Sequence, residues 1–334
     1  MRLEERDMKS KVFSFLKEWM LIIAIAAGIS GYFVYEALPL TASTHRIAGD
    51  AVAMLQPLLI FAMLFLTFTR IDPRKLRLRK WHLWLLLIQC GSFTLLGLIL
   101  IALPHSGLRV VLEGAMLCMI CPTATAGAVV TGKLGGNVND ITTYTVLINL
   151  AAALLIPVLV PFVHPNPSLS VLTSGTLILG KVFPLLLLPL IAAMLMRKLF
   201  PKLTQRISRY QELSFYLWAV ALSLAMAVTT RSIAHSTVSL ETQLWLVAVS
   251  LFCCILQFAA GRRIGAHYGD KITAGQALGQ KNTVLAIWAG YTFFTPVTSV
   301  AGGFYSIWHN LVNSWQLHDH NRQTTPHSTP RRRM

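Results

Sequence analysis

Long apolar runs, repeated along the whole chain, are the feature that most constrains how this sequence can fold. Only 13% of the 334 residues are charged and 54% are hydrophobic, which leaves too few charges to cover a water-facing surface. A helix needs about 20 apolar residues to cross a bilayer. Runs of about this length lie at 19–38, 50–68, 82–103, 109–131, 137–162, 178–196, 213–234, 242–260, 274–293 and 296–316. The sequence therefore predicts an all-α membrane protein in which residues 19–316 form ten transmembrane helices.

The two ends of the chain differ from these runs. Residues 1–18 are polar and basic, and the run that follows is too long for the apolar core of a cleaved secretory signal. We therefore expect 1–18 to be a short cytoplasmic segment and 19–38 to be the first span. Residues 317–334 are polar, basic and interrupted by proline, which predicts a disordered tail.

Positive charge is concentrated in alternate loops. The net charge of +16 would suit a nucleic-acid-binding protein if the basic residues formed a face on a polar domain, but here they lie between apolar runs. Of the 29 Lys and Arg residues, 24 fall at the termini and in every second loop, whereas Arg46, Arg109 and Arg231 fall in the other loops. Because basic loops stay in the cytoplasm, we expect both termini there, in the inner membrane of a bacterium. Membrane lipid is an expected partner and nucleic acid is not.

Metal, disulfide and catalytic sites are not indicated. The five cysteines lie within apolar runs and do not form two successive C-x-x-C motifs, which argues against zinc and disulfide bonds. The runs contain no clustered acid and base, no metal-ligand set and no G-x-S-x-G motif at membrane depth, which argues against an enzyme. We therefore expect neither a metal centre nor a cofactor.

Two runs are interrupted by residues that do not suit a continuous membrane helix. In the fourth run, Pro122 lacks the amide hydrogen that a helix requires, and Thr123 and Thr125 follow it. The ninth run contains the polar stretch GQKNT at 279–283. Irregular backbone at membrane depth survives only where protein or a water-filled cavity surrounds it. We expect the two breaks to face each other near the midplane and to form a binding site.

The breaks also indicate an internal repeat. Each is in the fourth run of its half, and each follows a run containing a glutamine, Gln89 in the third and Gln257 in the eighth. This arrangement predicts two inverted repeats of five helices, 19–162 and 178–316, each with a discontinuous fourth helix. For single residues a purely structural role remains an alternative to ligand binding. Pro122 alone can simply bend a helix, and Gln89 can form a hydrogen bond between helices.

Lys281, in the second break, argues most strongly for a function. A lysine at the centre of a bilayer costs about 2.5–3.5 kcal/mol, and no acidic residue lies near the centre of any run. Its charge must be balanced by a carboxylate at the end of a span, by hydroxyls and carbonyls, by an anionic ligand, or by loss of its proton.

These motifs resemble the bile acid:sodium symporter family. The resemblance rests on CPTATAGAVVTGKLGGNVNDITTYTV in the fourth and fifth runs, GQKNTVLA in the ninth and GGFYSIWHN in the tenth, and it extends over nearly the whole chain. It implies a panel domain and a core domain, with the fourth and ninth helices crossing as in sodium/proton antiporters. The candidates for substrate binding are Thr123, Thr125, Asn282, Thr283, His309 and Asn310. The candidates for coupling are Lys281, Gln89, Thr145 and Gln280.

Two departures from the family pattern concern sodium. Members that bind sodium typically carry Ser-Asn where this chain has Gly127 and Ala128, and a glutamate and a glutamine where it has Ala277 and Lys281. Sodium needs oxygen ligands and is repelled by an ammonium. Sodium coupling is therefore not expected, whereas proton coupling stays open.

Taken together, these features predict a secondary active transporter of a small organic, anionic solute that works by alternating access. Lys281 would replace the coupling cation, either as a permanent countercharge to the substrate or as a proton carrier. The alternatives are a sodium-coupled symporter of organic anions resembling bile acids, and a membrane sensor that keeps the fold without transport.

Overall fold

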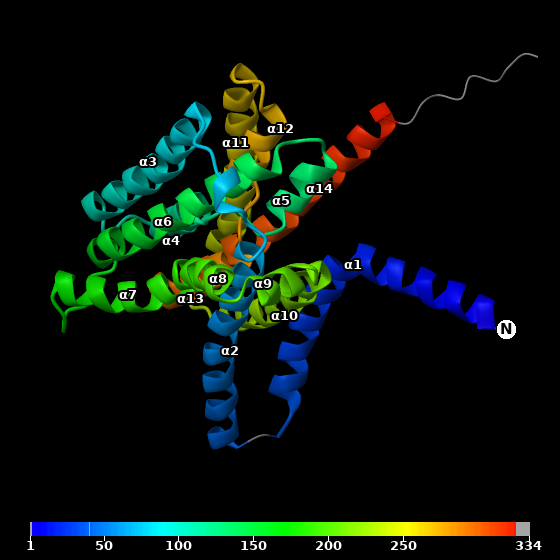
Figure 1. The fold of residues 1–334 in the computed structure, drawn as a ribbon. Coiled ribbons are helices and arrows are strands. Elements are labelled where there is room, and N and C mark those ends of the chain that lie inside the picture. Colours follow the sequence, from blue (N-terminus) through cyan, green and yellow to red (C-terminus); the bar gives the residue numbers. More distant parts are fainter. Residues whose placement is uncertain (1, 40, 325–334) are drawn as a thin grey trace, which may run out of the picture.

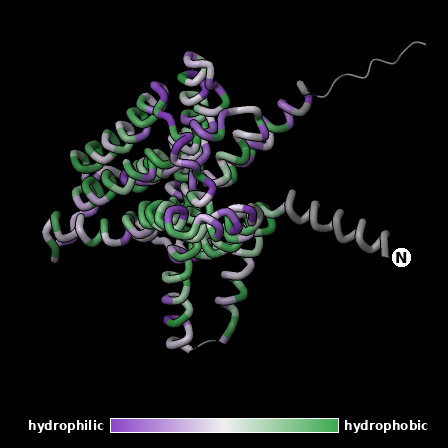
Figure 2. The backbone as a smooth tube through the Cα atoms, in the orientation of Figure 1, coloured by the Kyte–Doolittle hydropathy of each residue, from purple (hydrophilic) through white to green (hydrophobic). Residues whose placement is uncertain are grey.

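Every regular element of the described chain is a helix. The structure is a computed structural model that describes residues 2–39 and 41–324. Within these residues, helices α1 to α14 and two short 3-10 helices follow one another without a strand. Hydrophobic residues run along the helices, and hydrophilic residues gather toward their ends and in the loops (Figure 2). A bilayer suits this distribution, because its core is apolar. A helix can cross that core because it satisfies its backbone polar groups internally.

Six single helices are long and apolar enough to cross a membrane. They are α1 (Arg2–Ala37, apolar from Trp19), α2 (Ala42–Phe68), α3 (Lys80–Ala102), α6 (Val138–Val163), α10 (Gln211–Ala234) and α11 (Leu240–His267). A seventh span results if α7 (Val171–Leu186) and α8 (Leu188–Leu199), bent by 42° at Leu187, are taken together. The all-α membrane class is confirmed, whereas length and hydropathy identify six or seven spans rather than ten.

The other three predicted spans fall on shorter or more polar helices. The run at 109–131 folds as α4 (Arg109–Ile120) and α5 (Gly127–Lys133), and the run at 274–293 folds as α12 (Lys271–Gly279) and α13 (Thr283–Phe293). The last run begins with the 3-10 helix η2 (Pro296–Thr298) and continues as α14 (Ser299–Thr324). The remaining elements, η1 (Pro73–Lys75) and α9 (Pro201–Ser208), lie in connections.

One predicted boundary is wrong. Residues 317–324, expected in the disordered tail, belong to α14, while 325–334 lie outside the described residues. The extension follows a part of α14 that is held by Gln276, whose Nε2 donates to Asn313 Oδ1 and Gln316 Oε1 at 3.1 Å each. The first span lies where it was predicted, at Trp19–Ala37, although helix α1 already begins at Arg2, because the preceding segment is rich in Glu, Lys, Arg and Leu, which favour helix.

The helices pack in two groups. In the first group α1 and α2 pack against α10, and α2 also packs against α8. In the second, α3 packs against α4 and α6, and α11 packs against α12, α14 and α4. Figure 1 shows α3, α6, α11 and α12 on one side of α8 and α10, and the N-terminal half of α2 on the other. The groups meet where α10 contacts α13 and α14, and where α6 contacts α7.

Candidate functional site

The breaks in the fourth and ninth runs lie side by side. The segment between α4 and α5 and the segment between α12 and α13 form an antiparallel bridge at Thr123 and Lys281. Two amide-to-carbonyl hydrogen bonds of 2.8 and 2.9 Å flank this bridge, from Asn282 to Pro122 and from Ala124 to Gln280. The expectation that the two breaks face each other is confirmed. We call this region the crossing.

Local sequence explains why both helices stop here. Pro122 has no amide hydrogen with which to continue α4, and the hydroxyl of Thr123 donates to the carbonyl of Ala277 on α12 at 2.6 Å. In the second break, the side-chain oxygen of Asn282 accepts a hydrogen bond from the amide of Leu285 at 3.3 Å and caps α13, as a helix N-terminus requires. Each break therefore satisfies part of the backbone of the other.

The carbonyls freed at the ends of α4 and α12 are held by matching glutamine–tyrosine pairs. Gln89 of α3 donates to the carbonyl that follows α4 at 2.8 Å, and its Oε1 accepts the hydroxyl of Tyr144 from α6 at 2.8 Å. In the other half, Tyr305 of α14 donates to the last carbonyl of α12 at 2.8 Å, and Gln257 of α11 donates to Tyr305 at 3.1 Å. Sequence reasoning found the glutamines but missed the tyrosines, although each is the only tyrosine in the run after a break.

Lys281 lies at the crossing with its charge unbalanced. It is 1% exposed, and its Nζ has no hydrogen-bond partner within the described chain. The ion pairs formed by described residues do not include it. A buried ammonium without a partner is unfavourable in free energy, and it can bind an anion or exchange a proton.

Five of the predicted site residues meet at the crossing. They are Thr123, Gln280, Lys281, Asn282 and His309, and none is more than 7% exposed. His309 joins the others through its Nδ1, which accepts the amide of Lys281 at 3.4 Å. The site is therefore closed to solvent in this conformation.

The remaining predicted residues are placed differently. Thr283 is buried as the first residue of α13. Thr145 and Asn310 donate to carbonyls of their own helices at 2.9 and 2.7 Å. Thr125 is only partly buried and lines a cavity beside the crossing.

The positions at which the resemblance implies sodium ligands offer few free oxygens. Gly127 and Ala277 carry no side-chain oxygen, and Gln89 Oε1 is engaged by Tyr144. The amide oxygen of Gln280 is buried without a partner, and it lies 3.5 Å from where a Cβ on Gly127 would stand. A hard cation such as sodium needs several oxygen ligands.

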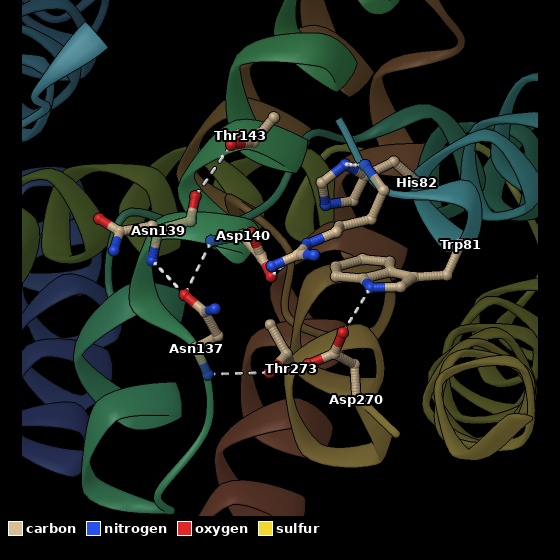
Figure 3. A network of polar contacts seen from close by, with 9 residues as sticks. Trp81, His82, Asn137, Asn139, Asp140, Thr143, Asp270 and Thr273 are labelled. Atoms are coloured by element: carbon tan, nitrogen blue, oxygen red, sulfur yellow. Dashed lines mark hydrogen bonds and ion pairs between the residues drawn. The ribbon is translucent and has the colours of Figure 1, made fainter. Parts of the chain in front are cut away.

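A polar network ties together the beginnings of α3, α6 and α12 (Figure 3). Asp140 of α6 accepts from Arg79 Nε at 3.0 Å, and Asp270, just before α12, accepts from the indole of Trp81 at 3.0 Å. The amide of Asn137, the N-cap of α6, donates to a threonine hydroxyl of α12 at 3.0 Å. Because α3 carries Gln89, α6 carries Tyr144 and α12 leads into a break, this network holds the surroundings of the crossing in register.

One cavity lies between the two groups of helices, on the side of α5. Its volume is about 390 Å³, and it is bounded by residues that follow the first break and by the connection after α2. The polar and charged residues that line it are Thr67, Arg70, Asp72, Lys75, Thr125, Asn139 and Thr142. We call it the α5 cavity.

A second cavity lies at the end of α10. It has a volume of about 420 Å³ and is lined by Arg231, His235, Tyr291 and Thr295, among others. An apolar cavity of about 360 Å³ between α1, α2 and α10 shares Arg231 and Tyr291 with it. Lys281 lines none of the three cavities, and the cavity at the end of α10, which we call the α10 cavity, shares no lining residue with the α5 cavity.

A buried carboxylate joins three elements near the α10 cavity. Glu113 of α4 is 0% exposed, and its Oε1 lies 3.1 Å from Arg109 Nε and 2.9 Å from His164 Nε2. Its Oε2 accepts the amide of Thr295 at 3.1 Å. Sequence reasoning placed this residue at the end of a span but did not identify its partners, which come from the end of α6 and the segment before η2.

Comparison with known proteins agrees with the membrane architecture. No curated protein matches the chain. The model of the SBF-like CPA transporter family matches residues 18–302, a range that includes both breaks and Lys281 but ends before His309 and Asn310. This match confirms the resemblance to bile acid:sodium symporters. The chain therefore belongs to the SBF-like CPA transporter family of multi-pass membrane proteins.

Proposed function

We propose that this protein is a secondary active transporter of a small organic anion, and that Lys281 takes the place of the coupling cation. The observation that carries the proposal is the unpartnered ammonium of Lys281, buried where two broken helices meet. Discontinuous helices that cross near the midplane provide unpaired backbone groups for substrates and ions. A bound anion would balance the charge that no described residue balances.

Ten spans in two inverted repeats give the best account of the helix order. Each broken pair then counts as one span, the bent pair α7 and α8 is the sixth, and α14 is the tenth. The glutamine–tyrosine pairs support the repeat, because each pair comes from the third and fifth spans of its half. In this scheme α1, α2, α7, α8 and α10 form the panel, and the other spanning helices form the core. Both termini would be cytoplasmic, in the inner membrane of a bacterium.

Alternating access would use the cavities on the two sides of the crossing. The α5 cavity lies beside the basic connection after α2 and would face the cytoplasm, whereas the α10 cavity would face outside. Each contains cationic side chains, Arg70 and Lys75 in the first and Arg231 in the second, which favour an anion. Movement of the core against the panel would connect Lys281 with one cavity at a time. Thr123, Asn282, Thr283 and His309 would contact the substrate.

Sodium is the coupling ion that this site accepts least. At about 4 Å and an effective dielectric constant of about 20, an ammonium repels a sodium ion by about 4 kcal/mol, or roughly a thousandfold in affinity. Lys281 would act either as a permanent countercharge to the substrate or as a proton carrier. In the first case Lys281→Gln weakens substrate binding at every pH. In the second it abolishes accumulation driven by a pH gradient and leaves downhill exchange intact.

Reconstituted transport tests the proposal. The purified chain in proteoliposomes is offered a panel of small carboxylates and sulfonates, with and without sodium and pH gradients. We expect uptake of an organic anion that is independent of sodium and lost in Lys281→Gln. Lys133→Gln, which changes an exposed lysine of α5, should leave uptake unchanged. Sodium-stimulated uptake that survives Lys281→Gln would instead establish a sodium symporter, and binding without uptake or exchange would establish a sensor.

A further inference from the structure

A fourth cavity lies away from the crossing, where α8, α9 and the end of α2 meet. Its volume is about 410 Å³. The residues that line it are Thr69, Arg197, Pro201, Lys202, Thr204, Gln205 and Ser208. Two of them are cations and none is acidic, so the cavity favours a negatively charged ligand. We call it the α9 cavity.

Arg197 fixes a positive charge in the wall of the α9 cavity. Its guanidinium donates to the carbonyl of Thr69 at 3.0 Å, while its Nε is buried without a partner in the described chain. Lys202, on the first turn of α9, is exposed. The cavity therefore combines one cation held by a hydrogen bond, Arg197, with one exposed cation, Lys202.

Hydroxyl groups in the same wall can accept hydrogen bonds. Thr204 and Ser208 stand one turn apart on α9, and their hydroxyls donate to carbonyls of the same segment at 3.1 and 2.9 Å. Because a hydroxyl that donates still has free lone pairs, both can accept from hydroxyls of a ligand.

Large apolar side chains are exposed beside the cavity. Leu199, Phe200 and Leu203 are 57%, 58% and 47% exposed. The same stretch carries exposed Lys198, Arg206 and Arg209 in addition to Lys202. Exposed apolar residues next to cations are typical of a helix that lies in the interface of a membrane, and a water-soluble ligand would not need them.

We propose that the α9 cavity binds the headgroup of an anionic phospholipid. Its phosphate would lie between Arg197 and Lys202, and the hydroxyls of a headgroup such as glycerol would face Thr204 and Ser208. The acyl chains would run along Phe200 and the neighbouring leucines. Basic pockets between membrane helices recognise anionic lipids in this way. A bound lipid would join the end of α2 to α8 and α9 and would stabilise the panel side of the protein.

Lipid binding to the purified full-length chain tests this inference without a transport measurement. The protein in detergent is titrated with phosphatidylglycerol or phosphatidylcholine, and the melting temperature and retained lipid are measured by fluorescence and native mass spectrometry. We expect phosphatidylglycerol to raise the melting temperature and to be retained preferentially. Lys202→Gln should weaken its affinity about fivefold, since one basic residue near a lipid surface contributes about 1 kcal/mol.

The control is Lys271→Gln, which removes an exposed lysine from another basic connection and should leave the affinity unchanged. Equal stabilisation by the two lipids, or an equal loss in both variants, would overturn the site. Glycerol 3-phosphate or inorganic phosphate that stabilises the protein as well as phosphatidylglycerol does would show that the cavity takes a soluble phosphate instead of a lipid.

Discussion

At the scale of single residues, the neighbours of Lys281 are as informative as its burial. A carboxylate partner would balance the ammonium permanently, and an anionic substrate would have to compete with it. No ion pair formed by the described residues includes Lys281, and the imidazole of His309 meets its backbone amide and not its Nζ. The charge therefore stays available to a ligand, in a site that also contains the polar side chains of Thr123, Asn282 and His309.

This arrangement predicts that stability and function oppose each other at Lys281. Lys281→Met keeps a long side chain but removes the unpaired buried ammonium, so we expect the free energy of unfolding to rise by about 1–3 kcal/mol. Uptake should be lost. The measurements are the melting temperature of the purified protein and uptake in proteoliposomes. Lys133→Met, at an exposed position of α5, should change neither; a melting temperature that falls in Lys281→Met would show that the lysine is paired.

The sequence identified those site residues that violate the rules for a membrane helix. Pro122, Gln280 and Lys281 are unfavourable inside an apolar run, and the structure brings them together. Tyr144 and the partners of Glu113 escaped notice, because a tyrosine in a span, or a glutamate near its end, is unremarkable until its partner is known. Their partners lie far along the chain, and only the packing of helices reveals them.

At the scale of helices, the packing of α11 against α12 positions the second break. Here Gly261 of α11 lies against the backbone of α12, where a Cβ would meet the carbonyl oxygen of Ala274 at 2.5 Å and the Cα of Gly275 at 3.0 Å. Neither backbone atom can rotate away as a side chain would. The two helices can approach this closely only because residue 261 has no side chain.

Gly261→Ala should therefore push α12 away from α11 and displace the crossing. We expect the free energy of unfolding to fall by about 1–3 kcal/mol, as for an overpacked core, and uptake to fall with it. The control is Gly91→Ala on α3, where a Cβ meets nothing within 4 Å and better helix propensity adds up to about 1 kcal/mol. Melting temperatures of the two variants should move in opposite directions, and an unchanged Gly261→Ala protein would refute the close packing.

Helix boundaries were predicted well where hydropathy alone decides them. The run at 137–162 became α6, Val138–Val163, and the run at 213–234 became α10, Gln211–Ala234. The prediction failed at the end of α14, which continues through the polar residues 317–324, because hydropathy marks the end of an apolar run and not the end of a helix. The bend at Leu187 also went unnoticed, since Pro184 and Pro189 stand in an otherwise apolar run.

At the scale of the whole molecule, the seam between the two groups of helices is where a transport cycle would act. The sequence could predict the membrane class and the two breaks, but it could not show which helices pack together, because packing depends on contacts between distant segments. The α5 cavity lies in this seam, with Lys75 of η1 on one wall and Asn139 and Thr142 of α6 on the other. Alternating access requires these walls to move apart and together.

Cross-linking the two walls of the α5 cavity should therefore stop transport. In a Lys75→Cys/Asn139→Cys variant, a flexible bis-maleimide reagent would join η1 to the beginning of α6, and we expect uptake into proteoliposomes to fall at least tenfold, because the core can no longer move against the panel. Asn139→Cys/Thr142→Cys places both cysteines three residues apart on α6 and lining the same cavity, so the same reagent should leave uptake largely intact. Mass spectrometry of the labelled protein measures how completely each pair is joined. Transport that continues at full rate after complete joining of residues 75 and 139 would show that the two groups do not move against each other at this seam.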